Sequence, residues 1–145
     1  MEDLDQNERL NELLISLYRS LLQYVAESSV WTDVQSEANA MAMQHIAAEQ
    51  RQGVGRLTDL LIQRGCVVDF GVYPTEFTDL HYLALDFLYE QLEADETRLI
   101  ARIEQAQAAA SGDHAAAALL AELAAAEKSR LLNLRALANR QPAAA

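Results

Sequence analysis

Apolar residues recur every three or four positions along this chain, over stretches much longer than a β-strand. This spacing places the apolar side chains on one face of an α-helix. The pattern predicts four helices, at about residues 5–28, 32–64, 76–110 and 113–139. Short breaks separate the first helix from the second and the third from the fourth. We therefore expect an all-α fold in a single domain over residues 1–145.

Residues that commonly begin and end helices support these boundaries. Asp5 with Glu8, and Thr32 with Gln35, have the spacing of a capping box, in which each side chain bonds a free backbone N–H of the first turn. Gly65 follows the second predicted helix, and glycine readily adopts the left-handed conformation that ends helices.

The connection between the second and third helices, residues 65–77, is much longer than the other two. Twelve extended residues at ~3.3 Å each reach about 40 Å, roughly the length of a helix of 25 residues. The segment can therefore cross the whole bundle, so that the third helix runs parallel to the second. We expect two antiparallel helical hairpins joined by this long crossover.

Composition and charge narrow the classes of function. Eleven Lys and Arg residues against 22 Asp and Glu residues give a formal net charge of −11, so we expect neither a nucleic acid nor a membrane as partner. The single cysteine excludes an internal disulfide and a thiolate metal cluster. No apolar run approaches the ~20 residues of a membrane helix. We expect a soluble, cytoplasmic protein.

Two glutamates interrupt the apolar stripes of the predicted helices. Glu49 lies between Ile46 and Gly53 on the face of the second helix that we expect to be buried, and Glu127 lies on that of the fourth. A carboxylate moved into a core needs a metal, a cation, a proton or water, because burial without a partner costs several kcal/mol. The alternative is that each glutamate lies at the edge of a broad stripe and reaches water.

The sequences around these glutamates resemble those of a known family. IAAEQRQGVGRLTDLLIQRG, which contains Glu49, is similar to the second helix of ferritin-like diiron proteins of the rubrerythrin and bacterioferritin group, and AAEKSRLLNLRAL, which contains Glu127, is similar to the fourth. Tyr24 matches the tyrosine of the first helix. The resemblance implies a ferritin-like four-helix bundle. It also implies two metal ions, held by one Glu from each of helices one and three and by a Glu and a His from each of helices two and four.

The second and fourth helices keep only half of the implied ligands. Gln52 and Arg130 stand three residues after Glu49 and Glu127, where the resemblance implies histidines. Arg130 brings a fixed positive charge to a cavity that the family uses for cations. We expect Arg130 to neutralise Glu49, Glu127 or both through charge-assisted hydrogen bonds, with Gln52 satisfying the remaining donors or acceptors.

The first and third helices are less complete. Leu17, seven residues before Tyr24, stands where the resemblance implies a glutamate, and it cannot bind a metal. On the third helix Glu93 and Glu96 are both candidates, and the sequence does not separate them. The pattern therefore indicates a degenerate diiron site, with no catalytic residue, no metal ligand and no cofactor expected.

Two functions follow from these observations. In the first, the chain is a non-enzymatic structural or protein-interaction module, most simply a homodimer. In the second, it is a metal-binding oxidoreductase or iron-handling protein with a rearranged site for iron or manganese. The ligands would then be Glu49, Glu127, Glu93 or Glu96, with His45, four residues before Glu49, as a further donor. The missing ligands favour the first.

Overall fold

The computed structural model describes residues 2–28, 34–82 and 85–140, and every regular element in these ranges is helical. The all-α prediction is confirmed. The predicted start of the second helix at Thr32 lies outside the described residues. In chain order the elements are α1 (Glu2–Tyr18), α2 (Leu21–Ser28), α3 (Val34–Gln63), the 3-10 helix η1 (Thr75–Tyr82), α4 (Leu85–Ala109) and α5 (His114–Arg140).

The prediction of one continuous first helix over residues 5–28 is wrong, because the helix breaks between α1 and α2. Two side chains satisfy the backbone donors that begin α2. The Leu21 N–H donates to Asp95 Oδ2 of α4 at 3.0 Å, and the Gln23 N–H donates to Ser20 Oγ at 3.3 Å. An N-terminus capped in this way does not need the preceding turn of helix.

α3 ends where the sequence predicts it. Gly65 has a φ of 77°, and the Cys66 N–H donates to the Leu61 carbonyl at 3.0 Å, which closes the last turn. Glycine adopts this left-handed conformation without the penalty that a Cβ would add.

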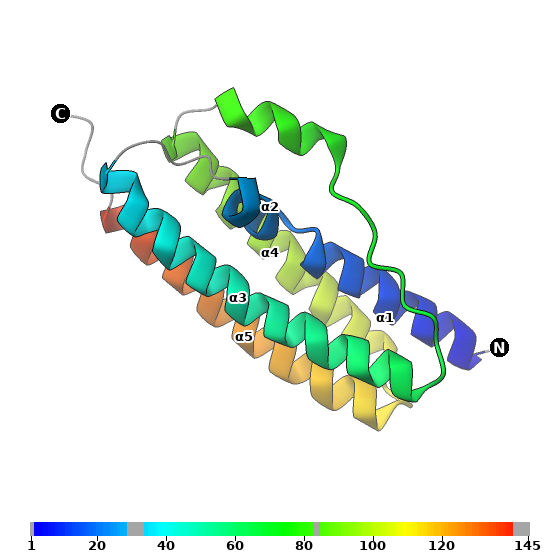
Figure 1. Cartoon of the computed structure of the whole chain (residues 1–145). Coiled ribbons are helices and arrows are strands. Elements are labelled where there is room, and N and C mark those ends of the chain that lie inside the picture. The colour runs from blue at the N-terminus through cyan, green and yellow to red at the C-terminus, as the bar shows by residue number, and fades with distance from the viewer. Residues whose placement is uncertain (1, 29–33, 83–84, 141–145) are drawn as a thin grey trace.

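The extended segment 66–74 then runs along α1 and α2 (Figure 1). Asn11 of α1 exchanges two hydrogen bonds with the backbone of Asp69, and further along Tyr73 donates to Glu27 of α2 at 3.0 Å. Between them lies Gly71, with a φ of 66°, where an added Cβ would lie 2.6 Å from Ile15. The segment carries the chain back to the end where α3 began, so α3 and α4 run in the same direction (Figure 1).

The third predicted helix, residues 76–110, begins too early. Residues 75–82 form η1, and α4 begins at Leu85. Phe77 of η1 packs against the rings of Tyr24 and Tyr73, with centroids 5.5 and 6.5 Å away. These contacts hold η1 over α2, away from the line of α4 (Figure 1).

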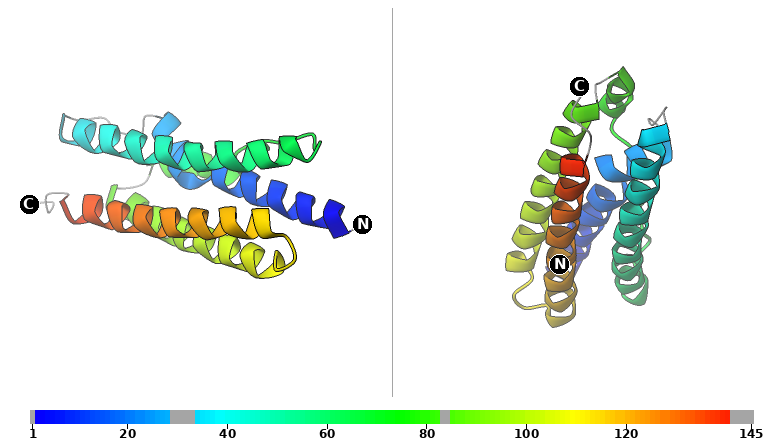
Figure 2. Two further views of the ribbon diagram at one scale, coloured as in Figure 1. Left: turned by 90° about the horizontal axis from the view of Figure 1, so that it is seen from below. Right: turned by 90° about the vertical axis from the view of Figure 1, so that its left-hand side faces the viewer.

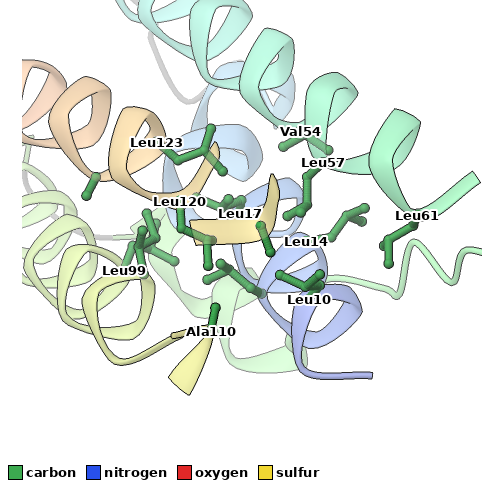
Figure 3. Close-up of a cluster of buried hydrophobic side chains, with 14 residues drawn as sticks. Leu10, Leu14, Leu17, Val54, Leu57, Leu61, Leu99, Ala110, Leu120 and Leu123 are labelled. Carbon is green, nitrogen blue, oxygen red and sulfur yellow. The ribbon is translucent and has the colours of Figure 1, made fainter. Parts of the chain in front are cut away.

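The long helices lie side by side, with α3 and α5 adjacent and α1 next to α4 (Figure 2). Their buried side chains form two apolar clusters. The first, shown in Figure 3, lies among α1, α3, α4 and α5 and includes Leu10, Leu14, Leu17, Val54, Leu57, Leu61, Leu99, Ile103, Leu120 and Leu123. The second lies among α2, α3, α4 and α5 and includes Leu21, Leu22, Val25, Met43, Ile46, Ala47, Leu88, Tyr89, Leu92, Leu134 and Leu137.

Candidate functional site

A polar layer separates the two apolar clusters. On α3, for example, Gln50 lies between Ala47 of the second cluster and Val54 of the first. The helices α2, α3, α4 and α5 contribute to this layer, and so does the break between α1 and α2. It comprises the buried polar and charged residues of the described chain, which are Ser20, Gln23, Gln50, Glu96, Glu127 and Arg130.

Gln50 is the hub of the polar layer. Its Nε2 donates to Glu96 Oε1 at 3.1 Å and to Glu127 Oε2 at 3.2 Å. Its Oε1 accepts from Ser20 Oγ at 3.0 Å and from Gln23 Nε2 at 2.9 Å. A side-chain amide has two donor hydrogens and two acceptor lone pairs, so this one is fully satisfied.

Gln23 connects the layer to the outside of the bundle. Its Nε2 also donates to the Ala47 carbonyl at 2.8 Å, and its Oε1 accepts from Arg51 Nη1 at 2.8 Å. The break between α1 and α2 therefore has a role at the site, since it brings Ser20 and Gln23 into the same network.

The ion pair of the layer lies within α5. Arg130 Nη2 donates to Glu127 Oε1 at 2.7 Å, and the two side chains are 6% and 1% exposed. The prediction that Arg130 neutralises a buried glutamate is confirmed for Glu127. Two polar atoms of the layer, Arg130 Nε and Glu96 Oε2, have no hydrogen-bond partner among the described residues.

Glu96 is the carboxyl group that the cation does not reach. Burial raises its pKa to about 10. The neighbouring carboxyl of Glu127 acts in the same direction, both as a negative charge and as a hydrogen-bond acceptor that favours the protonated form. The charge of Asp95 raises the pKa of Glu96 as well, while Arg130 lowers it. Burial dominates because a carboxylate loses its hydration when it enters an apolar surrounding.

Gly53, one turn after Gln50, lets α5 approach α3. An added Cβ would lie 2.9 Å from Leu123 Cδ2 and 4.0 Å from Arg130 Nη2. The missing side chain on α3 therefore leaves room beside the guanidinium. This observation explains why a glycine, which is unfavourable inside a helix, stands at this position.

The prediction that Glu49 lies on the core face of its helix is wrong. Its side chain is 45% exposed, and its Oε1 lies 3.1 Å from His45 Nε2, whose side chain is 76% exposed. The buried face of α3 is rotated by part of a turn, so that Gln50 occupies the place assigned to Glu49. Arg130 accordingly does not contact Glu49.

Gln52 is also exposed, so it satisfies no buried group. On α4 the structure separates the two candidates that the sequence left open. Glu96 is 1% exposed and belongs to the polar layer. Glu93 lies at the surface, 36% exposed, with its Oε2 3.6 Å from Arg135 Nε.

The remaining predicted positions lie outside the polar layer. Leu17 is 1% exposed and belongs to the first apolar cluster. Tyr24 is half-buried and packs edge to face against Tyr73, with ring centroids 5.3 Å apart. It holds the crossover segment in place.

The spacing of the buried residues of α3 indicates Gln50, which the apolar stripe through Glu49 did not include. Buried residues of α3 recur at alternating intervals of four and three, and Gln50 continues that series where Glu49 interrupts it. Such spacing keeps one seam of a helix against its neighbours. The series is Met43, Ala47, Gln50, Val54, Leu57 and Leu61.

The residues of the polar layer do not fit a pair of metal ions. Iron in such bundles needs carboxylates and imidazoles. The layer offers two carboxyl groups, two amides, one hydroxyl and a guanidinium that lies against Glu127. In the described ranges, no three His, Cys, Asp or Glu side chains are grouped closely enough to hold a metal. Arg130 repels an incoming cation, since its charge is permanent.

Comparison with protein-family models, with curated proteins and with solved structures finds no match for this chain. Within residues 2–28, 34–82 and 85–140, none of the helices has the length and apolar character needed to span a membrane.

Proposed function

We propose that this chain is a ferritin-like bundle in which a guanidinium has replaced the metal centre, and that it acts as a metal-free structural or protein-interaction module. The buried Glu127–Arg130 ion pair, with its link through Gln50 to Glu96, is the observation that carries the proposal. In this proposal, the protein's own cation neutralises an acid at a position that ferritin-like diiron proteins use to bind iron.

The course of the chain supports a ferritin-like topology. The segment 66–74 follows α1 and α2, and it separates a hairpin built from α1, α2 and α3 from a second hairpin of α4 and α5 (Figure 1). A single long crossover between two hairpins is the connection typical of ferritin-like four-helix bundles.

The positions within the layer support the same origin. Glu127 and Arg130 are three residues apart on α5, the interval at which the family places a glutamate and a histidine. On α3 the corresponding buried pair is Gln50 and Gly53, one residue later than the sequence resemblance suggests. An amide and an empty position thus replace the second glutamate and histidine, and Arg130 extends over Gly53.

The proposed module has no catalytic residue and no cofactor, and we expect it in the cytoplasm as a homodimer. A fixed internal cation makes folding independent of metal supply. Light scattering coupled to size-exclusion chromatography tests the dimer, which predicts twice the chain mass of 16.1 kDa.

Metal loading tests the proposal. The purified protein is incubated anaerobically with Fe(II), and separately with Mn(II), and bound metal per chain is measured after desalting. We expect no bound metal in the wild type. About two ions per chain would contradict the proposal and support an iron-handling or oxidoreductase function instead.

A designed variant sharpens this test. Gln50→Glu combined with Arg130→His removes the guanidinium and adds two metal ligands, a carboxylate and an imidazole, to the layer. If the layer is a former metal site, this variant gains metal binding that the wild type lacks. The matched control is Gln52→Glu with Arg135→His, which makes the same changes at exposed positions and leaves metal binding unchanged.

A further inference from the structure

The polar layer contains two carboxyl groups and one cation, and nothing else in it carries charge. Arg130 and Glu127 face Glu96 from α5, and only the neutral amide of Gln50 faces it from α3. The break between α1 and α2 contributes the uncharged Ser20 and Gln23. On its own helix, the neighbour Asp95 adds a further negative charge.

The guanidinium of Arg130 bonds Glu127 and does not bond Glu96. Arg130 Nη2 bonds Glu127 Oε1, and no hydrogen bond or ion pair joins Arg130 to Glu96. The Leu21 N–H and the Arg98 guanidinium both donate to the carboxylate of Asp95, so neither donor bonds Glu96. An ionised Glu96 would therefore be a buried negative charge whose only donor is the amide of Gln50.

The acceptor geometry leads to the same conclusion. Glu96 Oε2 has no donor within reach, although the residue is 1% exposed. A carboxylate can only accept hydrogen bonds, whereas a carboxylic acid has one O–H to donate. With a proton on Oε2, this unpaired acceptor becomes a donor, and the carboxyl of Glu127 is the hydrogen-bond partner next to it.

We propose that Glu96 carries a proton in the folded protein at neutral pH and donates it in a hydrogen bond to the Glu127 carboxylate. The layer is then neutral overall, with one carboxylic acid, one carboxylate and one guanidinium. Two like charges sharing a site commonly leave one of them protonated. This inference needs only the geometry of the layer, and it holds whether or not the layer descends from a metal site.

The bound proton makes the bundle sensitive to alkali. The pKa of Glu96 is raised by burial to about 10 in the folded protein, from 4.5 in its ordinary state. The contribution of the protonated Glu96 to stability is therefore complete at pH values below the ordinary pKa, and it is lost as the pH rises toward the raised pKa of about 10. Ionisation would leave a buried net negative charge beside Gln50 and Glu127.

Infrared spectroscopy of the wild type and of Glu96→Gln tests the proposal. At about pH 7 the exposed carboxyl groups are ionised, so a carboxylic-acid C=O band reports a protonated buried group. We expect this band in the wild type, its loss in Glu96→Gln, and its retention in Glu93→Gln, the matched control one turn earlier on α4. Absence of the band from the wild type, or its persistence in Glu96→Gln, would overturn the proposal.

A second measurement needs no variant, in case Glu96→Gln does not fold. The wild type is labelled at the glutamate side-chain carboxyl carbons with ¹³C, and the resonances are followed by NMR from about pH 5 to pH 9. One carboxyl should keep the chemical shift of the acid across this range. If every carboxyl titrates below about pH 6, the bound proton does not exist.

Discussion

The apolar clusters and the polar layer are both fully buried, yet they hold the helices together in different ways. In the clusters, each leucine adds apolar surface removed from water, at about 25 cal/mol per Å², and each contributes nearly independently. In the polar layer every residue depends on the others, because a buried donor or acceptor that loses its partner costs about 1–3 kcal/mol. The clusters therefore provide stability, while the layer makes stability conditional on a specific set of partners.

This difference predicts that a single substitution in the polar layer lowers the free energy of unfolding more than a single substitution in the clusters. Replacing the interacting polar residues together should lower it less. Substitution of a buried ion pair by apolar residues of similar volume is often neutral or stabilising.

Arg130→Ala should have the largest effect. It leaves the Glu127 carboxylate buried without its cation, and we expect the free energy of unfolding to fall by about 2–4 kcal/mol. Urea denaturation at about pH 8 measures it. Adding Gln50→Leu, Glu96→Leu and Glu127→Leu to Arg130→Ala should recover most of the loss, because the amide donors that the two acids satisfy are removed with them. An unchanged unfolding curve for Arg130→Ala would show that the ion pair does not contribute to stability.

Gln50→Leu should follow. The substitution keeps the size of the side chain but removes its bonds to Ser20, Gln23, Glu96 and Glu127, and we expect a loss of about 2–3 kcal/mol. The control is Gln52→Leu, the same change two residues later on the exposed face of α3, which should stay within about 0.5 kcal/mol of the wild type. A larger loss of stability for Gln52→Leu than for Gln50→Leu would contradict the burial of Gln50.

The pH dependence of stability is the third prediction. Because the pKa of Glu96 is raised in the folded state, to about 10, the wild type should lose stability between about pH 5 and pH 9. Glu96→Gln mimics the protonated acid and should flatten this part of the curve. Thermal melts at several pH values measure the slope, and equal slopes in the two proteins would contradict the assignment.

Arg64→Ala should have the smallest effect. The guanidinium of Arg64 donates to Asp113 Oδ1 at 2.6 Å, but both side chains are partly exposed, so we expect a loss of about 0.5–1 kcal/mol at neutral pH. The hydrogen bond from Arg64 lowers the pKa of Asp113. Its contribution is present above the ordinary pKa and is lost as the pH falls through the lowered value. At low pH the free energy of unfolding of Arg64→Ala should therefore approach that of the wild type, as urea denaturation can show.

Most of the architecture follows from the sequence, because it depends on local patterns. The helix period, the stop at Gly65 and the length of the segment before Pro74 are properties of neighbouring residues. The break between α1 and α2 is different in kind. The cap that Ser20 provides for the Gln23 N–H is local, but the break also depends on Asp95, which lies 74 residues after Leu21 and accepts a hydrogen bond from its N–H. No local pattern contains that contact.

The site was predicted in part for a similar reason. Glu127 and Arg130 lie three apart on one helix face, so their pairing is a local property. Glu49 and Gln50 are adjacent polar residues that differ by about 100° in direction around the helix. The nearest apolar residue, Ile46, is compatible with either choice. Only the longer series of alternating intervals from Met43 to Leu61 favours Gln50, which the packing of α3 against the other helices buries.

Whether Arg130 has taken the place of a metal pair is tested by the melting temperature of the wild type with and without Fe(II) or Mn(II) at millimolar concentration. A ligand that binds only the folded state raises this temperature. If the guanidinium of Arg130 has taken the place of the metals, the melting temperature is the same in both conditions. A rise of several degrees that the Gln50→Leu variant abolishes would show that the polar layer still binds metal.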